Sequence, residues 1–206
     1  MFARTERLLL RPGWVEDAPE LARAIGEEGI VRNLAGAPWP YSVEDARAFL
    51  TRERDPLLPS FLVSLRTRAA PRVIGAAGIA RRDDNALELG YWIARPYWGL
   101  GFATEAVRAV VSIARATGLV AITAGHFHDN PASGRVLQKT GFRATGAIAK
   151  RFSLARGADA PCVLYELAES GGGDVECATD LEAAMRWQTC DICEEIRREE
   201  IRLIAA

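Results

Sequence analysis

The stretch from Ile93 to Glu105 carries the clearest chemical signal in the sequence. It has the pattern of a strand that leads into a turn containing Gly99 and Gly101, followed by a helix from about Thr104. Small residues in such a turn let the backbone approach a ligand closely, and the first N–H groups of the helix favour an anion such as phosphate. The turn lacks the Gly-Lys-Ser/Thr ending of a Walker loop and the third glycine of a dinucleotide fingerprint. The residues therefore predict a phosphate site, with a turn that binds no ligand as the alternative.

Two motifs give the chain a resemblance to a known family. The run from Trp98 to Ala103 resembles the acetyl-CoA pyrophosphate loop of the GNAT N-acetyltransferase superfamily, in which Gln or Arg is usual at the position of Trp98. The second motif, Asn130 to Ser133, follows at the distance that the family leads us to expect. The surrounding Tyr-Trp-Gly-x-Gly-x-Ala-Thr-Glu-Ala sequence is similar to the branch that acetylates the N-terminal alanine of ribosomal proteins. The resemblance covers roughly residues 5–168 and implies a GNAT fold, with acetyl-CoA as co-substrate and an amine as acceptor.

The resemblance also implies where acetyl-CoA is held. In this family the strand before the loop splays from its neighbour, and the pantetheine arm binds the exposed backbone, here at Tyr91, Trp92 and Ile93. A backbone N–H in that stretch would polarise the thioester carbonyl. The remaining cofactor-binding residues that we expect are Asn130 and the loop residues Trp98, Gly99, Leu100, Gly101, Phe102, Ala103 and Thr104. No metal is expected.

Acetyl transfer to an amine also needs a base for the amine and a proton for the departing thiolate. Glu88 is the only carboxylate on its strand, and several relatives carry a catalytic Glu near this position. We therefore predict Glu88 as the general base, with a glutamate that faces solvent as the alternative. Glu105 is explained by the favourable interaction of a carboxylate with a helix N-terminus. His126 and His128 are expected at the surface or in a cap.

The acid is expected at Ser133. Many relatives carry a Tyr acid where this chain has Leu137, whereas the ribosomal-protein branch places a Ser three residues after the Asn, and Ser133 matches that Ser. Its hydroxyl could protonate or hydrogen-bond the thiolate. The alternative is structural, because Asn130 and Ser133 also suit the first turn of a helix.

The elements that must position these residues follow from apolar periodicity and turn signals. Their order, βααβββαβαββ, predicts an α/β domain with a mixed twisted sheet of about six to seven strands and helices on both faces. The expected helices are 16–25, 42–50, 104–117 and 132–140, and the expected strands are 7–11, 61–65, 73–79, 87–93, 120–124, 152–154 and 163–167.

Composition excludes several classes of protein. The chain has 206 residues, of which 49% are apolar and 26% charged, so it is neither an intrinsically disordered nor a low-complexity protein. A net charge of -1 gives no overall attraction to nucleic acid or to anionic membranes. No run of 18 apolar residues is long enough to span a bilayer, and the first seven residues lack the apolar stretch of a signal peptide. A cytoplasmic location is therefore expected.

Charge divides the chain near a glycine-rich seam at 170–173. We expect an acetyltransferase domain over 1–169, followed by a linker and an acidic helical tail over 170–206. Apolar residues at helical spacing give the tail one apolar face, which would dock on the domain or form a homodimer contact. Three of the four cysteines lie in the tail, and Cys190-x-x-Cys193 is incidental or else half of a metal or redox site.

Together these features predict an N-acetyltransferase that moves an acetyl group from acetyl-CoA to a primary amine. The acceptor is expected to be a protein N-terminus by resemblance to the branch, and a small-molecule amine remains open. Direct transfer is favoured over a covalent enzyme intermediate, because no cysteine lies in the motif region. The alternative is a non-catalytic acyl-CoA-binding or interaction module with the same fold, which Leu137 and Trp98 favour.

Overall fold

One mixed sheet forms the centre of the molecule. The computed structural model describes residues 1–67 and 70–168, so the predicted tail helix, its dimer contact and Cys177, Cys190 and Cys193 lie outside the described residues. The sheet has eight strands in the order β1-β2-β3-β4-β5-β6-β8-β7. The strands are β1 (Ala3–Arg4), β2 (Leu8–Arg11), β3 (Ser60–Leu65), β4 (Arg72–Arg81), β5 (Leu87–Ile93), β6 (Ile122–Phe127), β7 (Phe142–Ser153) and β8 (Ala158–Leu167). The strand that the sequence did not predict is β1, which is too short to show an alternating pattern.

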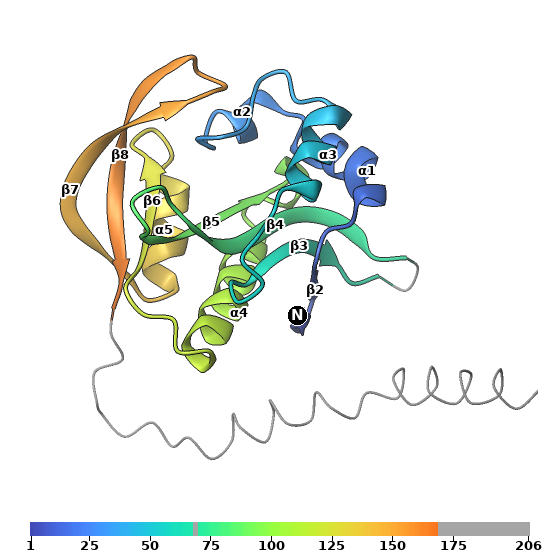
Figure 1. Ribbon diagram of the computed structural model, residues 1–206, viewed down its shortest axis with the longest axis horizontal. Helices are drawn as coiled ribbons and strands as arrows, with labels where there is room; N and C mark the ends of the chain where they lie inside the picture. The colour runs from blue at the N-terminus through green and yellow to red at the C-terminus, as the bar shows by residue number, and fades with distance from the viewer. Residues whose placement is uncertain (68–69, 169–206) are drawn as a thin grey trace, which may run out of the picture. The chain divides into compact units, whose positions relative to one another are not determined.

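Helices cover both faces of the sheet, as predicted. They are α1 (Ala18–Ile25), α2 (Glu28–Val31), α3 (Val43–Thr51), α4 (Phe102–Ala116) and α5 (Pro131–Lys139). Figure 1 shows α4 and α5 on one face and α1 and α3 on the other. The predicted capping box begins α3, because Ser42 Oγ accepts a hydrogen bond from Asp45 N and the Asp45 carboxylate accepts one from Ser42 N.

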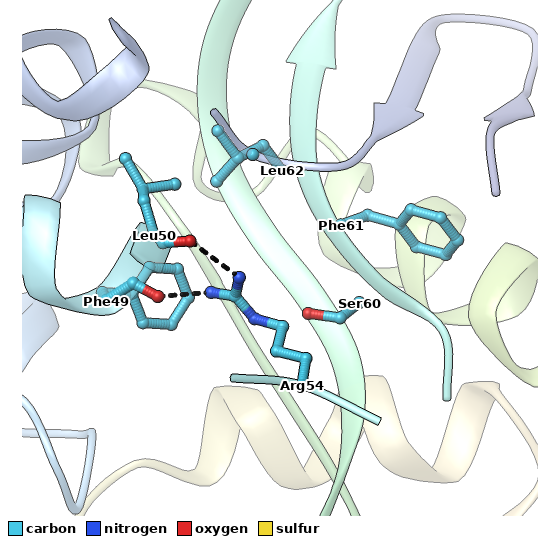
Figure 2. A pocket seen from close by; sticks show the side chains of 7 residues that line it. Phe49, Leu50, Arg54, Ser60, Phe61 and Leu62 are labelled. Carbon is cyan, nitrogen blue, oxygen red and sulfur yellow. Dashed lines mark hydrogen bonds between the residues drawn. The ribbon is translucent and has the colours of Figure 1, made fainter. Parts of the chain in front are cut away.

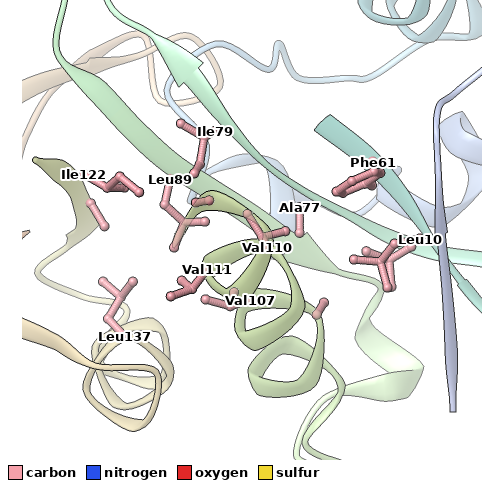
Figure 3. Packing of buried hydrophobic residues seen from close by; sticks show 14 of the residues in the cluster. Leu10, Phe61, Ala77, Ile79, Leu89, Val107, Val110, Val111, Ile122 and Leu137 are labelled. Atoms are coloured by element: carbon pink, nitrogen blue, oxygen red, sulfur yellow. The ribbon is translucent and has the colours of Figure 1, made fainter. Parts of the chain in front are cut away.

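The larger core lies between the sheet and the helices that carry the site. The predicted apolar face of α4 is buried against β4 and β5, with Val107 and Val110 fully enclosed. Figure 3 shows Val107, Val110 and Val111 directed toward Ala77 and Leu89 on the sheet. Burying one such side chain is worth about 1.5–3 kcal/mol, so this packing fixes α4, and with it the preceding loop, on β5.

A small cavity lies on the opposite face, between α3 and β3 (Figure 2). Its volume is about 10 Å³, room for one water molecule at most, so it is no substrate site. Arg54 donates to the carbonyl oxygens of Phe49 and Leu50 there, at 2.5 and 3.2 Å. Burial lowers the pKa of Arg54, and the partial negative charge of the last carbonyl groups of α3 stabilises the guanidinium.

The second half of the sheet differs most from the prediction. Strand β6 starts later than expected and runs on to Phe127, while β7 and β8 form a far longer hairpin than the two short strands predicted. Strand β7 is an edge strand on which most side chains are exposed, so it lacks the alternation of apolar and polar residues that reveals a strand.

Candidate active site

The site begins where two parallel strands separate. Strand β5 pairs with β6 only at Leu87–Leu89, opposite Ile122–Ala124. Beyond that point β6 continues beside β8 as far as Phe127, and β5 continues beside β4 as far as Ile93. The edge of β5 from Gly90 to Ile93 therefore opens into a gap between the two strands, which is the splay that the family resemblance implied.

Backbone alternation decides which groups of β5 face this gap. Ala94 N donates to Ile74 O on β4 at 2.7 Å, so the N–H and C=O groups of Trp92 also point toward β4, where Trp92 lies opposite Ala76. The backbone groups of Tyr91 and Ile93 point the other way, into the gap. Trp98 Nε1 donates to Ile93 O at 2.6 Å and takes up one of them. Of the three predicted pantetheine positions, Tyr91 and Ile93 thus offer backbone groups to the gap, whereas those of Trp92 point to β4.

The predicted phosphate loop connects this edge of β5 to α4. Gly99 and Gly101 have φ values of +77° and +83°, a conformation that glycine adopts far more readily than other residues. The first helical bond runs from Glu105 N to Gly101 O, so the N–H groups of Phe102, Ala103 and Thr104 precede the hydrogen-bonded part of the helix. The loop is exposed, and a Cβ built at Gly99 would enter open space within the described structure. These N–H groups and the helix dipole make the loop suitable for an anion.

A charged cluster that the sequence did not reveal supports the loop from behind. Arg7 binds Glu105 through Nε and Nη2, at 2.7 and 2.6 Å, and its Nη1 donates to Leu100 O at 3.0 Å. The Arg7 guanidinium also lies 4.3 Å from the ring centre of Phe102. Burial alone would raise the pKa of Glu105, but hydrogen bonds from Thr5 and Arg7 outweigh it and lower the pKa below its ordinary value. Glu105 is therefore a structural anchor of the loop as well as a first-turn carboxylate.

A broad open groove extends from this loop along the exposed face of α4. Its volume is about 800 Å³, and its lining includes the cationic side chains of Arg7, Arg108 and Lys139 together with the carboxylates of Glu6 and Glu105, of which Glu105 is paired with Arg7. The same groove contains Gly101 and Thr104, so the cations line a surface that is continuous with the loop. Three cations against two carboxylates leave this lining with a small net positive charge, which favours phosphate groups.

The second motif lies across the gap at the start of α5. Tyr91 Oη lies within hydrogen-bond distance of two atoms of Ser133, 2.7 Å from Oγ and 2.9 Å from the backbone oxygen. Asn130 occupies the N-cap position of α5, but its side chain makes no capping hydrogen bond within the described residues, which leaves it available to a ligand. Leu137 is fully buried in the core under α5. The structure thus brings Ser133 to β5, whereas the position of the family's tyrosine acid is sealed in the core.

Glu88 lies on the other face of β5 and is not the solvent-facing glutamate of the alternative. One carboxylate oxygen accepts a hydrogen bond from Arg151 on β7, and the other lies 3.7 Å from Arg82 Nη1. Its side chain is 19% exposed. Glu88 is therefore held in place by two guanidinium groups, and its use as a base requires one of these ion pairs to loosen.

The prediction that His126 lies at the surface or in a cap is wrong. Because β6 extends to Phe127, His126 belongs to the strand and is buried rather than exposed or in a cap. Its Nδ1 lies 2.8 Å from Phe127 O, and its ring packs against that of Tyr165, 5.5 Å away between centres. A Cβ built on Gly134 would lie 2.6 Å from His126 Nε2 and 3.0 Å from Tyr165 Oη. A glycine at 134 therefore lets the first turn of α5 lie directly on these two rings.

A second ionic cluster follows the end of β6. Asp129, which follows β6, binds Arg32 at 3.0 Å and both terminal nitrogens of Arg156 at 2.9 Å. Arg156 Nε also donates to Arg32 O, and Leu154 N donates to Ala35 O. The β7–β8 turn is thereby tied to the segment around α2, as Figure 1 also shows. The hydrogen bond from Arg156 is the main cause that lowers the pKa of Asp129.

Comparison with known proteins identifies the family. Residues 7–143 match the family model described as Acetyltransferase (GNAT) domain. The chain is also 31% identical over 153 residues to the uncharacterized N-acetyltransferase YoaA of Bacillus subtilis, which covers 70% of this chain and 84% of that protein. This chain belongs to the GNAT acetyltransferase family. As such it is an acetyl-CoA-dependent acyltransferase.

Solved GNAT structures share the fold. The ribosomal-protein-S5-alanine acetyltransferase from Vibrio fischeri superposes with a TM-score of 0.68 at 20% identity, over 84% of this chain and all of that one. RimL, a ribosomal L7/L12 alpha-N-protein acetyltransferase solved with coenzyme A, gives 0.65 at 19% identity, over 81% and 97%. The microcin C7 self-immunity acetyltransferase MccE, solved with acetyl-CoA and AMP, gives 0.64 at 17% identity, over 79% and 92%.

The residues of this GNAT domain fit the phosphate end of acetyl-CoA. A loop with two left-handed glycines, N–H groups at the start of α4 and nearby cations form the donor set that a pyrophosphate needs. In the described part of the chain, no group of three His, Cys, Asp or Glu side chains could hold a metal ion. Among the described helices, none is both long and apolar enough to cross a membrane.

Proposed function

We propose that this GNAT enzyme transfers the acetyl group of acetyl-CoA directly to a primary amine, and that the amine is a protein N-terminus. The observation that carries the proposal is the contiguity of the exposed glycine loop, the open edge of β5 and Ser133. The branch resemblance favours a protein N-terminus, and two of the proteins that share the fold are named as ribosomal-protein acetyltransferases.

Most of the predicted residues have a role in this proposal, and Trp92, whose backbone groups point to β4, has none. Loop N–H groups from Gly99 to Thr104 hold the pyrophosphate, and the backbone groups of Tyr91 and the N–H group of Ile93 hold the pantetheine arm. Asn130 contacts the same arm from α5. Acetyl-CoA supplies a thioester whose carbonyl is polarised by a backbone N–H of this strand.

The proposed chemistry balances without a further reactant. The neutral amine bonds to the acetyl carbon while the carbon–sulfur bond breaks, the amine loses one proton, and the sulfur finally gains one. We assign acceptance of the amine proton to Glu88, and the hydrogen bond to the departing sulfur to Ser133.

Direct transfer agrees with the state of the one cysteine in the described residues. Cys162 is buried on β8, and burial is the main cause that raises its pKa above the ordinary thiol value. A nucleophilic cysteine reacts as the thiolate, which this environment disfavours. A covalent acetyl-cysteine intermediate is therefore not part of the proposal.

Thiol release from acetyl-CoA tests the proposal when it is measured with the full chain and a panel of amines. The panel contains peptides that begin with Ala or Ser, the same peptides with blocked N-termini, and small amines. We expect release with free N-termini and none with blocked ones. Tight binding of acetyl-CoA without release for any acceptor would favour the non-catalytic module instead.

A further inference from the structure

The contact between β5 and α5 includes two hydroxyl groups, those of Tyr91 and Ser133, which can be hydrogen-bonded in two alternative ways. The Tyr91 side chain leaves β5 on the face covered by α4 and α5, and its hydroxyl lies within hydrogen-bond distance of both Ser133 Oγ and Ser133 O. A phenol has one proton and can direct it to only one of these two acceptors.

The two choices have opposite consequences for Ser133. If Tyr91 donates to Ser133 O, the 2.7 Å contact requires Ser133 Oγ to donate to Tyr91, and the serine proton points away from any ligand. If Tyr91 donates to Ser133 Oγ, the serine proton is free to turn outward into the gap. A small rotation of the phenol O–H therefore switches the direction of the serine proton.

We propose that Tyr91 is a positioning residue that aims the Ser133 hydroxyl proton at the departing sulfur of acetyl-CoA. The inference rests on the proposed role of Ser133 and adds a second hydroxyl to it. Donation from Tyr91 to Ser133 Oγ also polarises the serine O–H and makes it a stronger hydrogen-bond donor.

Tyr91 acts by hydrogen bonding rather than as the acid itself. Burial is the main cause that raises the pKa of Tyr91 to about 12, although its hydrogen bond with Ser133 opposes this. An ordinary thiol has a pKa of about 8.5, so the phenol keeps its proton when a thiolate leaves. Ser133 donates a hydrogen bond to the departing sulfur, the sulfur later takes its proton from water, and both hydroxyl groups end unchanged.

The packing beneath α5 places this hydroxyl pair. Gly134 lies directly on His126 and Tyr165, where any side chain would collide. The helix is thereby seated close to the sheet, with Ser133 against β5. Residue 137, where many relatives carry a tyrosine, is a buried leucine, so the second turn of α5 offers no hydroxyl at that position. Tyr91 instead approaches from the strand.

The first test is a double-mutant cycle on the full chain with Tyr91→Phe, Ser133→Ala and both. We expect Tyr91→Phe to lower kcat about fivefold, the effect of one ordinary hydrogen bond, with the KM for acetyl-CoA within about twofold. In the Ser133→Ala background, Tyr91→Phe should have no further effect. An equal loss in both backgrounds would show that Tyr91 does not act through Ser133.

A second readout needs no acceptor amine. Free CoA is bound to each variant, and ionisation of its thiol is followed by ultraviolet absorbance as the pH is raised. A hydrogen bond from Ser133 stabilises the thiolate, so Ser133→Ala should raise the pKa of the bound thiol, and Tyr91→Phe should raise it by about half a pH unit. The double variant should match Ser133→Ala alone.

The outcomes separate the inference from the function on which it rests. If Ser133→Ala changes neither kcat nor the thiol titration, the proposed role of Ser133 fails. If Ser133→Ala acts but Tyr91→Phe does not, only the inference about Tyr91 fails. Tyr165→Phe is the matched control, since it removes a hydroxyl next to Gly134 and leaves the Tyr91–Ser133 pair in place. An equal effect of Tyr165→Phe would mean that loosened packing explains the result, and would overturn the inference.

Discussion

The two faces of β5 are built from different interactions. On the face toward α4 and α5, here called the neutral face, the part of the site next to β5 consists of backbone groups and two uncharged hydroxyls, those of Tyr91 and Ser133, while charged side chains lie farther along, at the glycine loop and α4. On the other face, ion pairs hold the key groups, with Glu88 bound to Arg151 and Arg82. Neutral groups at fixed positions suit a co-substrate that is the same in every turnover. An ion pair can open so that one of its partners binds a charged group of the acceptor instead. We therefore expect the face that carries Glu88, here called the ionic face, to bind the substrate that varies.

The largest expected effect tests the ionic face. If Glu88 takes the amine proton, Glu88→Gln should lower kcat by about 10²–10⁴, because the amide cannot accept a proton. Initial rates with a peptide that begins with Ala measure the effect, and the affinity for acetyl-CoA should stay unchanged.

Arg151→Gln is the matched control for Glu88. It breaks the same ion pair but keeps the carboxylate, so a smaller loss of kcat than in Glu88→Gln is expected. Equal losses of kcat in the two variants would show that Glu88 serves only as the ion-pair partner of Arg151. The ionic face of β5 would then supply no base for the reaction.

The next effect tests the neutral face. Gly101→Val places a β-branched residue at a φ of +83° in the loop and should weaken CoA binding at least tenfold, about 1.4 kcal/mol. Gly118→Val is the control, because Gly118 has a φ of +73° just beyond the other end of α4. Calorimetry should show unchanged CoA affinity in the control. Unchanged affinity in a folded Gly101→Val variant would contradict the assignment of the loop.

The neutral face could largely be predicted from the sequence because its signals are local. The two glycines, the start of α4 and the apolar face of α4 lie within one continuous stretch, where spacing directly determines geometry. The second motif likewise lies within one turn of α5. Even so, the sequence did not show that Trp92 directs its backbone to β4, because that depends on pairing with a distant strand.

The ionic face and the supports of the loop could not be predicted in the same way. Arg151 lies 63 residues from Glu88, Arg32 lies 97 from Asp129, and Arg7 lies 98 from Glu105. No periodicity connects residues that far apart in one sequence. The burial of His126 was missed for a related reason, since the end of β6 is set by pairing with β8 and not by its own residues.

A smaller effect is expected where charge supports the neutral face. Arg7→Gln removes the contacts to Glu105 and Leu100 and should weaken CoA binding about threefold, about 0.6 kcal/mol, because the loop is less well held. Arg66→Gln is the control, since Arg66 bonds to the carbonyl groups of Thr5 and Glu6 in the same turn. A lower melting temperature without a change in CoA affinity would mean that Arg7 stabilises the fold and not the loop.

The smallest effect concerns the ion cluster that ties the β7–β8 turn to the segment around α2. The pKa of Asp129 is lowered in the folded protein, so its ionised form stabilises the fold above the ordinary value of 3.8. This contribution is lost as pH falls through the lower, folded pKa. Because Asp129 is half exposed, Asp129→Asn should lower the melting temperature by only about 2 °C at pH 7. The difference from the unsubstituted protein should begin to shrink below about pH 3.8 and should vanish only once pH has fallen below the lowered pKa of Asp129, where its carboxyl is protonated. Asp83→Asn, in the turn between β4 and β5, provides the control for a general loss of negative charge. A difference that stays constant or widens as pH falls would show that the charge of the Asp129 carboxylate does not stabilise the link between the β7–β8 turn and the segment around α2.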